Sequence, residues 1–337
     1  MEEKRVRIVD IAEELGLSTA TVSNVIHGKT KKISKETVKR VQELLEKRAY
    51  VPSMAGILLS QNNSRIVGVV VNNHEKYENK VLEDAFISTS LNALLFTLEQ
   101  AGYFMMVKAT VEWNEIIKFA SMWNMEGLVL IGFCESDYRS LRENMHIPFV
   151  VYDGYFAENK GICNIIIDNY DGGVQVGKYL YQKGHRKVLC ISDNNICTDK
   201  ERMDGCRDAM GEGITDFLQV PLTVAKRCGF YRKNLTMIMQ HSAVFAVSDT
   251  YAIELMHFLQ EQGIKIPNDI SVVGFDNMGL CEHVYPSLTT VGQDAYERAK
   301  AAVTALQKLK AGEMTEAVQK LRVYLVERES VGTYGTE

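Results

Sequence analysis

The chain has 337 residues and a mass of 38.0 kDa. This is longer than one hydrophobic core usually spans, so two or three domains are expected. Apolar residues make up 46% and charged residues 24% of the sequence, which is typical of a globular protein, and no apolar run approaches the ~20 residues of a membrane-spanning helix. The first residues lack the apolar segment of a secretory signal, so we expect a cytoplasmic protein with no membrane partner.

The net charge of −5 is unevenly distributed along the chain. Residues 1–60 carry 11 Lys and Arg against 8 Asp and Glu, whereas the remainder carries 27 against 35. This distribution argues against a protein that coats nucleic acid along its whole surface. It allows a small, mildly basic DNA-binding head on an acidic body that has another task.

The first 50 residues predict three short helices. Apolar residues recur at helical spacing over 8–15, Gly16 is suited to end that helix, and Ser18 is suited to cap a second helix over 19–28. Two short helices joined by a tight glycine-containing turn are typical of a helix-turn-helix. A third helix from Ser34 supplies apolar residues that can close a three-helix core. The alternative, a small helical bundle with no role in DNA binding, is less favoured by this pattern of glycine and serine.

The second helix carries the side chains expected to read DNA. Its polar face holds Thr19, Ala20, Ser23 and Asn24. Residues near the start of a recognition helix contact base edges in the major groove. An Asn can bond adenine through both of its polar atoms, and a Thr or Ala methyl group can contact the thymine methyl. Lys and Arg side chains over 29–40 are expected to contact phosphates, so DNA binding should weaken steeply with salt.

This head resembles the DNA-binding region of the LacI/GalR family of bacterial transcriptional regulators. The resemblance rests on D-I-A-x-x-L-G-L-S-x-x-T-V-S at 10–23, I-S-x-x-T-x-x-x-V at 33–41 and Y-x-P at 50–52. It implies a hinge helix over 51–62 that pairs with the same helix of a dimer mate and inserts a leucine, here Leu59, into the minor groove. The DNA-contacting residues implied are Thr19, Ala20, Thr21, Ser23, Asn24, His27, Lys29, Ser34, Ser53, Gly56 and Leu59. Asn24 stands where the family usually has Arg, and Gly56 where it usually has Ala.

From Arg65 onward, apolar strands alternate with helices. Strands are predicted at 66–71, 125–132, 147–153, 185–193, 243–249 and 269–276. This alternation favours a parallel α/β sheet. Polar residues follow the strand ends, where open α/β sheets bind ligands; they are Asn72, Asp153, Asp193, Asp249 and Asp276.

The body resembles the same family through I-D-N-x-x-G-G (167–173), E-R-x-x-G (201–205), A-V-S-D (246–249), I-S-V-V-G-F-D (270–276) and P-S-L-T-T-V (286–291). The implied fold is an α-helical helix-turn-helix head (1–50) joined by a hinge helix and linker (51–62) to an α/β core (63–337). The core is periplasmic-binding-protein-like, with two Rossmann-like subdomains, and the chain crosses between them near 164, 292 and 322. The N-subdomain spans about 65–163 and 293–321, and the C-subdomain about 164–292 and 322–332.

The resemblance places effector-binding residues in the cleft between the subdomains. Arg202 and Asp276 lie in matching motifs, as a guanidinium and a carboxylate suited to ligand oxygens and hydroxyls. Asn72, Asp153 and Ser248 follow strand ends, and Phe230, or its neighbour Tyr231, is a candidate stacking surface. For Asp249, capping of the next helix is favoured over ligand binding. The polar segment 72–84 either lines the cleft or forms an exposed loop.

The sequence therefore predicts a homodimeric repressor, released from a palindromic operator by a small-molecule effector such as a sugar, related polyol or nucleoside. The runner-up is a regulator whose effector strengthens DNA binding. A solute receptor and an α/β enzyme are alternatives from other classes; the head argues against the first and the missing catalytic constellation against the second. The seven histidines show no ligand spacing, so no metal or cofactor is expected.

Overall fold

The computed structural model describes residues 6–51, 64–133, 145–154, 163–313 and 318–335. The chain divides into two compact units, a head that ends at Ser64 and a core that begins at Arg65. Ser53, Gly56 and Leu59 of the expected hinge lie outside the described residues. None of the described helices is long and apolar enough to cross a membrane.

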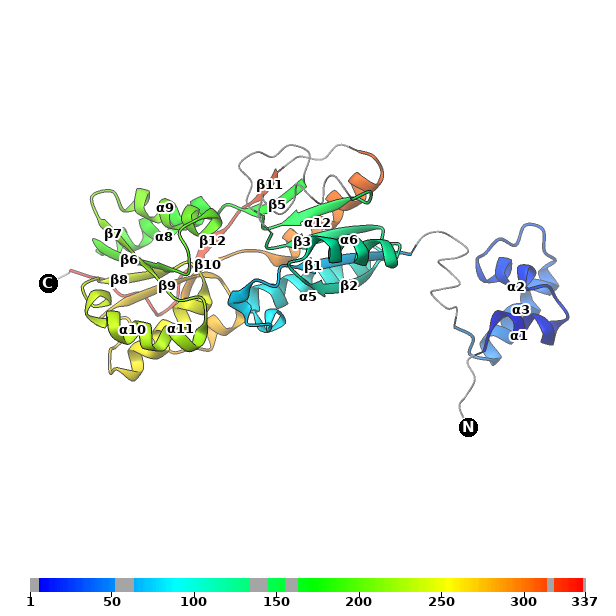
Figure 1. Cartoon of the computed structure of the whole chain (residues 1–337), viewed down its shortest axis with the longest axis horizontal. Coiled ribbons are helices and arrows are strands. Elements are labelled where there is room, and N and C mark those ends of the chain that lie inside the picture. Colours follow the sequence, from blue (N-terminus) through cyan, green and yellow to red (C-terminus); the bar gives the residue numbers. More distant parts are fainter. Residues whose placement is uncertain (1–5, 52–63, 134–144, 155–162, 314–317, 336–337) are drawn as a thin grey trace. The chain divides into compact units, whose positions relative to one another are not determined.

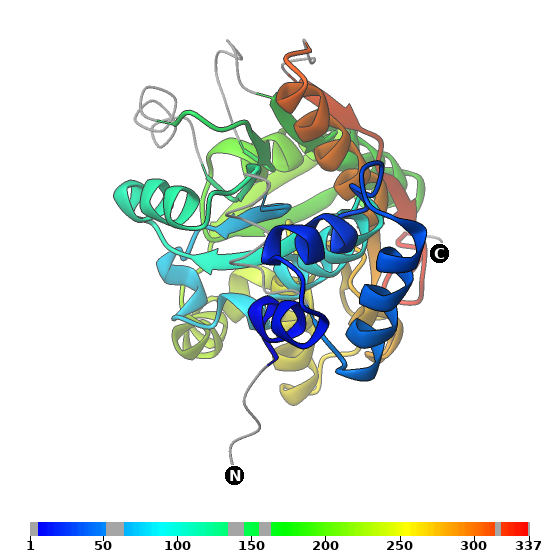
Figure 2. The same ribbon diagram turned by 90° about the vertical axis from the view of Figure 1, so that its right-hand side faces the viewer.

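The head consists of three helices, α1 (Ile8–Leu15), α2 (Thr19–Ile26) and α3 (Lys35–Lys47) (Figure 2, blue helices). Ser18 and Ser34 cap α2 and α3 by accepting the backbone N–H groups of Thr21 and Thr37, both at 3.1 Å. The core of the head is formed by buried Ile11, Ala12, Val22, Val25, Val41 and Leu44. The three predicted helices and their caps are confirmed, although α2 ends two residues before Gly28.

The N-subdomain is built on a parallel six-stranded sheet in the order β11-β5-β4-β3-β1-β2 (Figure 1). The strands are β1 (Ile66–Val71), β2 (Phe104–Ala109), β3 (Gly127–Ile131), β4 (Phe149–Tyr152), β5 (Cys163–Ile167) and β11 (Val318–Leu321). Helices α5 (Ala85–Gln100) and α12 (Ala295–Lys310) pack on one face and α6 (Trp113–Met122) on the other. β1 is buried along its whole length because both faces of the sheet are covered.

The C-subdomain contains a second six-stranded sheet in the order β12-β10-β9-β8-β6-β7. Its strands are β6 (Lys187–Ser192), β7 (Ile214–Gln219), β8 (Ala243–Ala246), β9 (Ser271–Asp276), β10 (Thr289–Gly292) and β12 (Tyr324–Val326), and only β12 pairs antiparallel among them. The covering helices are α8 (Asn169–Gln182), α9 (Cys197–Met210), α10 (Val224–Ile238) and α11 (Asp249–Glu261). One 3-10 turn, η3 (Gly279–Glu282), follows β9.

Helices α8 and α9 pack at very close range because glycines lie at their contact. A Cβ on Gly173 would lie 1.9 Å from the carbonyl oxygen of Arg202, and one on Gly205 would lie 2.1 Å from the carbonyl oxygen of Tyr170. Side chains at these positions would separate the helices. The I-D-N-x-x-G-G and E-R-x-x-G motifs therefore fix the position of α9, which carries Arg202.

The chain crosses between the subdomains three times. The crossings follow Ile167 of β5, Gly292 of β10 and Leu321 of β11. The second and third lie where the sequence placed them. The first lies a few residues beyond 164, because 163–167 forms a strand of the N-terminal sheet between β4 and β11. This lies within several residues of the predicted crossing, and the N-subdomain includes β5 up to Ile167.

Candidate functional site

A cavity of about 750 Å³ lies between the two subdomains of the core. This volume lies within the ~300–1,000 Å³ typical of small-molecule sites. Its wall from the N-subdomain comes from the ends of β1 and β4 and from 74–87, and its wall from the C-subdomain from the ends of β6, β8 and β9 and from α9. Of the six residues predicted to bind effector, the cavity brings together Asn72, Asp153, Arg202, Ser248 and Asp276.

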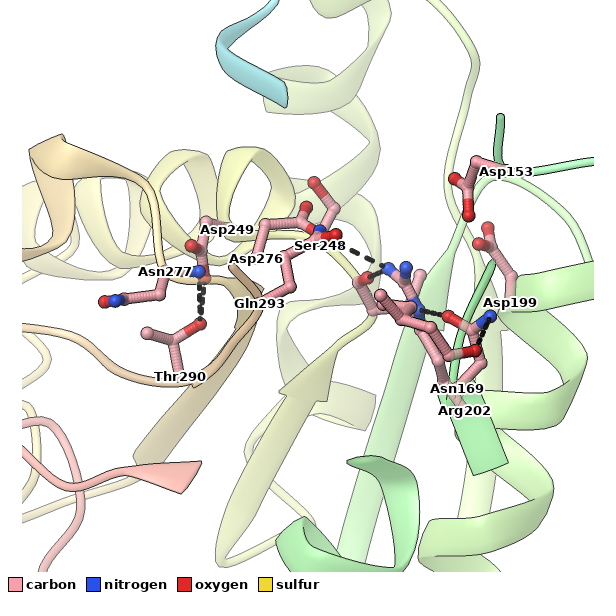
Figure 3. Close-up of polar contacts among 12 residues, drawn as sticks. Asp153, Asn169, Asp199, Arg202, Ser248, Asp249, Asp276, Asn277, Thr290 and Gln293 are labelled. Carbon is pink, nitrogen blue, oxygen red and sulfur yellow. Dashed lines mark hydrogen bonds and ion pairs between the residues drawn. The ribbon is translucent and has the colours of Figure 1, made fainter. Parts of the chain in front are cut away.

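Arg202 is held rigidly at the cavity wall. Its Nε donates to Asn169 Oδ1 at 2.9 Å and its Nη1 to the Val247 carbonyl at 2.6 Å (Figure 3). The guanidinium also lies 3.7 Å from the ring centroid of Phe275, and the side chain is almost fully buried. A preorganised guanidinium of this kind can donate to ligand oxygens with little loss of side-chain freedom.

Asp276 ends β9 and faces Arg202, with 3.8 Å between its Oδ1 and Nη1 of the guanidinium. Gln293 Nε2 donates to the same oxygen at 2.9 Å. Burial raises the pKa of Asp276, and the Arg202 charge opposes that shift. The backbone of Asp276 has a φ of 118°, a conformation rarely adopted by residues other than glycine and often found at functional sites.

Asp153 forms an ion pair with the buried Arg298 of α12. Nη1 of Arg298 donates to Gln293 Oε1 at 2.6 Å. Because Gln293 also donates to Asp276, a continuous polar network joins the N-subdomain to the C-subdomain through the second crossing. Arg298 was not anticipated from the sequence, since its position inside an amphipathic helix gave no sign that it points to the cavity wall.

Ser248, not Asp249, caps α11. The Ser248 hydroxyl accepts the backbone N–H of Thr250 at 3.3 Å, and Asp249 is the first helical residue. The carboxylate of Asp249 instead accepts from the backbone N–H of Met278 at 2.9 Å and from the Thr290 hydroxyl at 2.6 Å. The capping interpretation of Asp249 is therefore wrong: this buried side chain anchors the loop after β9.

The polar segment 72–84 lines the cavity, which decides between its two interpretations. It forms two short 3-10 turns, η1 (Glu75–Tyr77) and η2 (Val81–Glu83). Asn72 Nδ2 donates to the Gly132 carbonyl at 3.0 Å. The segment's other residues at the wall are His74, Glu75, Lys76, Tyr77, Glu78, Lys80, Glu83 and Asp84.

Phe230 does not line the cavity, contrary to the expectation. It packs against the core of the C-subdomain beside Tyr231, which is itself buried, because both belong to the inner part of α10. The aromatic residues at the wall are Tyr77, Phe86 and Tyr251.

The exposed face of α2 carries the residues expected to read DNA. Thr19, Ala20 and Asn24 are exposed and Ser23 is partly exposed, whereas Val22 and Val25 face the core. The hydroxyls of Thr21 and Ser34 take part in the caps of α2 and α3. His27 is partly exposed where α2 ends, and Lys29 is exposed in the loop that follows.

Comparisons with known proteins match both parts of this architecture. The model of "Bacterial regulatory proteins, lacI family" matches residues 7–53, and that of "Periplasmic binding protein-like domain" matches 178–331. The HTH-type transcriptional repressor PurR of Vibrio atlanticus is 30% identical over 343 residues, covering 97% of this chain and 98% of that protein. The chain belongs to the lacI family of bacterial regulatory proteins. The HTH-type transcriptional repressor CytR of Escherichia coli is 26% identical over 90% of both chains.

Solved structures agree with the fold of this lacI-family regulator. The lac repressor dimer bound to operator and the anti-inducer ONPF has a TM-score of 0.83 at 21% identity, covering 98% of this chain and all of that chain. The transcriptional regulator CelR in complex with cellobiose has a TM-score of 0.70 at 23% identity, with 97% of this chain covered. The curated relatives are repressors, which favours neither the solute-receptor nor the enzyme alternative.

Several cavity residues of this lacI-family regulator were not predicted from the sequence. Asp199 lies three positions before Arg202 on α9, so helical spacing could have placed both on one face. Tyr251 lies in the first turn of α11, directly after the A-V-S-D motif. Within the described residues, no group of His, Cys, Asp or Glu is arranged to hold a metal ion.

Proposed function

We propose that this lacI-family regulator acts in the cytoplasm as a homodimeric repressor, and that a small-molecule effector bound between the subdomains of its core releases it from a palindromic operator. The exposed polar face of α2 supports the DNA-reading role, and the effector is proposed to be a sugar or a related polyol or nucleoside. Relatives of this fold carry such ligands: a LacI family regulator from Enterococcus faecium was solved with bound ribose (TM-score 0.69, 20% identity, covering 80% of this chain).

The observation that carries the proposal is the network through Gln293. Its amide joins Asp276 at one cavity wall to Arg298, and through it Asp153, at the other. A ligand that competes for Asp276 or Asp153 would alter the contacts that hold the subdomains together. Such a ligand shifts the conformation only to the extent that it binds one arrangement more tightly than the other.

The test begins with DNA. The full chain is used to select duplexes from a random pool, and binding to the selected duplex is followed by fluorescence anisotropy at several salt concentrations. We expect a palindrome with half-sites about one helical turn apart and affinity that falls steeply with salt. Asn24→Ala should weaken binding to the selected palindrome by about 1–3 kcal/mol. Glu46→Gln, at an exposed position of α3, serves as a control. Recovery of no preferred sequence would contradict the proposal.

The effector is then sought with the same protein. Sugars, polyols and nucleosides are screened for a rise in the unfolding temperature, and each hit is added to the protein–operator complex. A ligand at 100 times its Kd adds roughly 2.7 kcal/mol to stability, which is readily detected. Release of DNA supports induction, and tighter DNA binding supports the corepressor alternative. Hits that alter DNA binding equally in Arg202→Ala would exclude this cavity as their site.

A further inference from the structure

Two carboxylates of the C-subdomain converge at one place in the cavity wall. Nδ2 of Asn194 donates to Asp193 Oδ1 at 2.6 Å and to Asp199 Oδ2 at 3.0 Å. The Ser192 hydroxyl donates to the same Asp199 oxygen at 2.6 Å. Asp193 is only 5% exposed, and both carboxylates line the cavity. We call Asp193 and Asp199 the carboxylate pair.

Among the described residues, neither Asp193 nor Asp199 forms an ion-pair contact, and the charges of Lys76 and Arg202 act on Asp199 from farther away. The two arginines of the cavity wall have other partners: Arg227 binds both oxygens of Glu254 at 2.7 Å, and Arg202 binds Asn169 and the Val247 carbonyl. Two carboxylates shielded from water raise each other's energy when both are ionised. A cation bound beside the pair, from the cavity, would relieve that repulsion.

Lys76 shows how the cavity treats a positive charge. It enters the wall from η1 of the N-subdomain, and its Nζ lies 5.1 Å from the ring centroid of Tyr77. Burial alone would lower the pKa of Lys76, yet that pKa is raised because Tyr77 and the acidic groups Asp193, Asp199 and Asp84 favour the charged form. The cavity therefore stabilises an ammonium group in spite of its partial burial.

Aromatic rings add to this preference. Tyr77 and Phe86 line the cavity from one subdomain and Tyr251 from the other. A cation that lies within about 6 Å of an aromatic ring face is attracted to it, and more strongly where water is excluded. A phosphate or carboxylate group placed beside the carboxylate pair would instead be repelled by both negative charges.

We propose that the effector carries an ammonium group bound by Asp193 and Asp199, as an amino sugar would, and that this pair determines specificity. The hydroxyl groups of the effector would then contact Arg202 and Asp276. This inference rests on the proposed effector role of the cavity.

The test compares ligands that differ only in charge. Binding of D-glucose, D-glucosamine, N-acetyl-D-glucosamine and D-glucose 6-phosphate to the full chain is measured by calorimetry and thermal shift, with the corresponding galactose set beside it. A charged hydrogen bond adds enough free energy for the amine to bind about tenfold or more tightly than its parent. Parent, acetylated or phosphorylated sugars that bind as tightly as the amine would overturn the inference alone. No binding by any compound, amines included, would overturn it together with the sugar-effector proposal.

Substitutions at the carboxylate pair test whether these two residues cause the preference for the amine. Asp193→Asn and Asp199→Asn should bring the ratio of amine to parent affinity close to one. Glu212→Gln, which removes an exposed carboxylate of the same subdomain, should leave the ratio unchanged. A readout without ligand is the titration of the Lys76 amine by NMR: it should lie above that of ordinary lysines and fall in Asp199→Asn. A Lys76 pKa at or below the ordinary value, or one unchanged by Asp199→Asn, would contradict the electrostatic argument.

Discussion

The two walls of the cavity are built in different ways. In the C-subdomain, Arg202 is fixed by hydrogen bonds to Asn169 and Val247 and by the packing of α8 on α9 at glycines. Asp276 accepts a hydrogen bond from Gln293, and the loop that follows it is anchored by Asp249 behind the wall. In the N-subdomain, 74–84 forms two single-turn 3-10 helices with several exposed side chains. A wall of the first kind holds a common set of ligand contacts in place, whereas a wall of the second kind can change its residues at little cost in stability. The difference suggests that the C-subdomain orients the ligand and the segment 74–84 adapts the site to it.

We expect the largest loss of stability from a substitution in the network that connects the two walls. Arg298→Met leaves the carboxylate of Asp153 without its buried partner, and removing one member of a buried pair costs about 3–5 kcal/mol. Urea unfolding of the isolated variant measures this loss. Arg298→Met combined with Asp153→Asn should recover part of the stability; a double variant no more stable than the single one would contradict the assignment of the pair.

The packing of α8 on α9 comes next. Gly173→Ala places a methyl group against the Arg202 carbonyl, and overpacking of this kind costs about 1–3 kcal/mol. The variant should also lose effector response, because α9 carries Arg202. Gly229→Ala in α10 is the matched control: a Cβ there meets no atom within 4 Å, so we expect unchanged or slightly higher stability.

The carboxyl group of Asp199 should make the unfolding free energy depend on pH. Burial raises its pKa, opposed by Arg202 and the Ser192 hydroxyl. At pH values from the ordinary aspartate pKa of about 4 up to the raised value, the folded state keeps a proton that the unfolded chain has lost, so this group's contribution to stability falls as pH rises. Asp199→Asn should flatten the dependence of unfolding free energy on pH across this window. An unchanged slope would contradict the raised pKa.

The smallest change in unfolding free energy is expected from a substitution in the segment 74–84. Lys80 and Glu83 are both largely exposed, with 3.7 Å between the ammonium and the carboxylate. Lys80→Ala should change the unfolding free energy by no more than about 0.5 kcal/mol. A loss comparable to that of Gly173→Ala would show that this wall is as firmly built as the other.

The contrast between the walls also explains which parts of the site could be predicted from the sequence. Arg202 and Asp276 lie in motifs whose neighbouring residues, such as Gly173, are required by packing, so the motifs could be recognised and placed. The strands and helices of both subdomains followed from apolar periodicity. The segment 74–84 has neither periodicity nor a motif, and its polar residues are equally compatible with an exposed loop. The prediction for Phe230 was wrong because an aromatic residue near a predicted cleft can equally well be buried in the core, and the sequence does not distinguish the two positions.

The three crossings between the subdomains lie side by side. The backbone N–H of Asp168 donates to the Leu321 carbonyl at 2.8 Å, which joins the first crossing to the third, and Gly292 pairs with Tyr324, which joins the third to the second. The third link, Arg322 and Val323, is only two residues long, so it allows almost no separation of the sheets at that point. Opening of the cleft is thereby restricted to rotation about an axis through these links. A small angular change at this axis produces its largest displacement at the parts of each subdomain farthest from it.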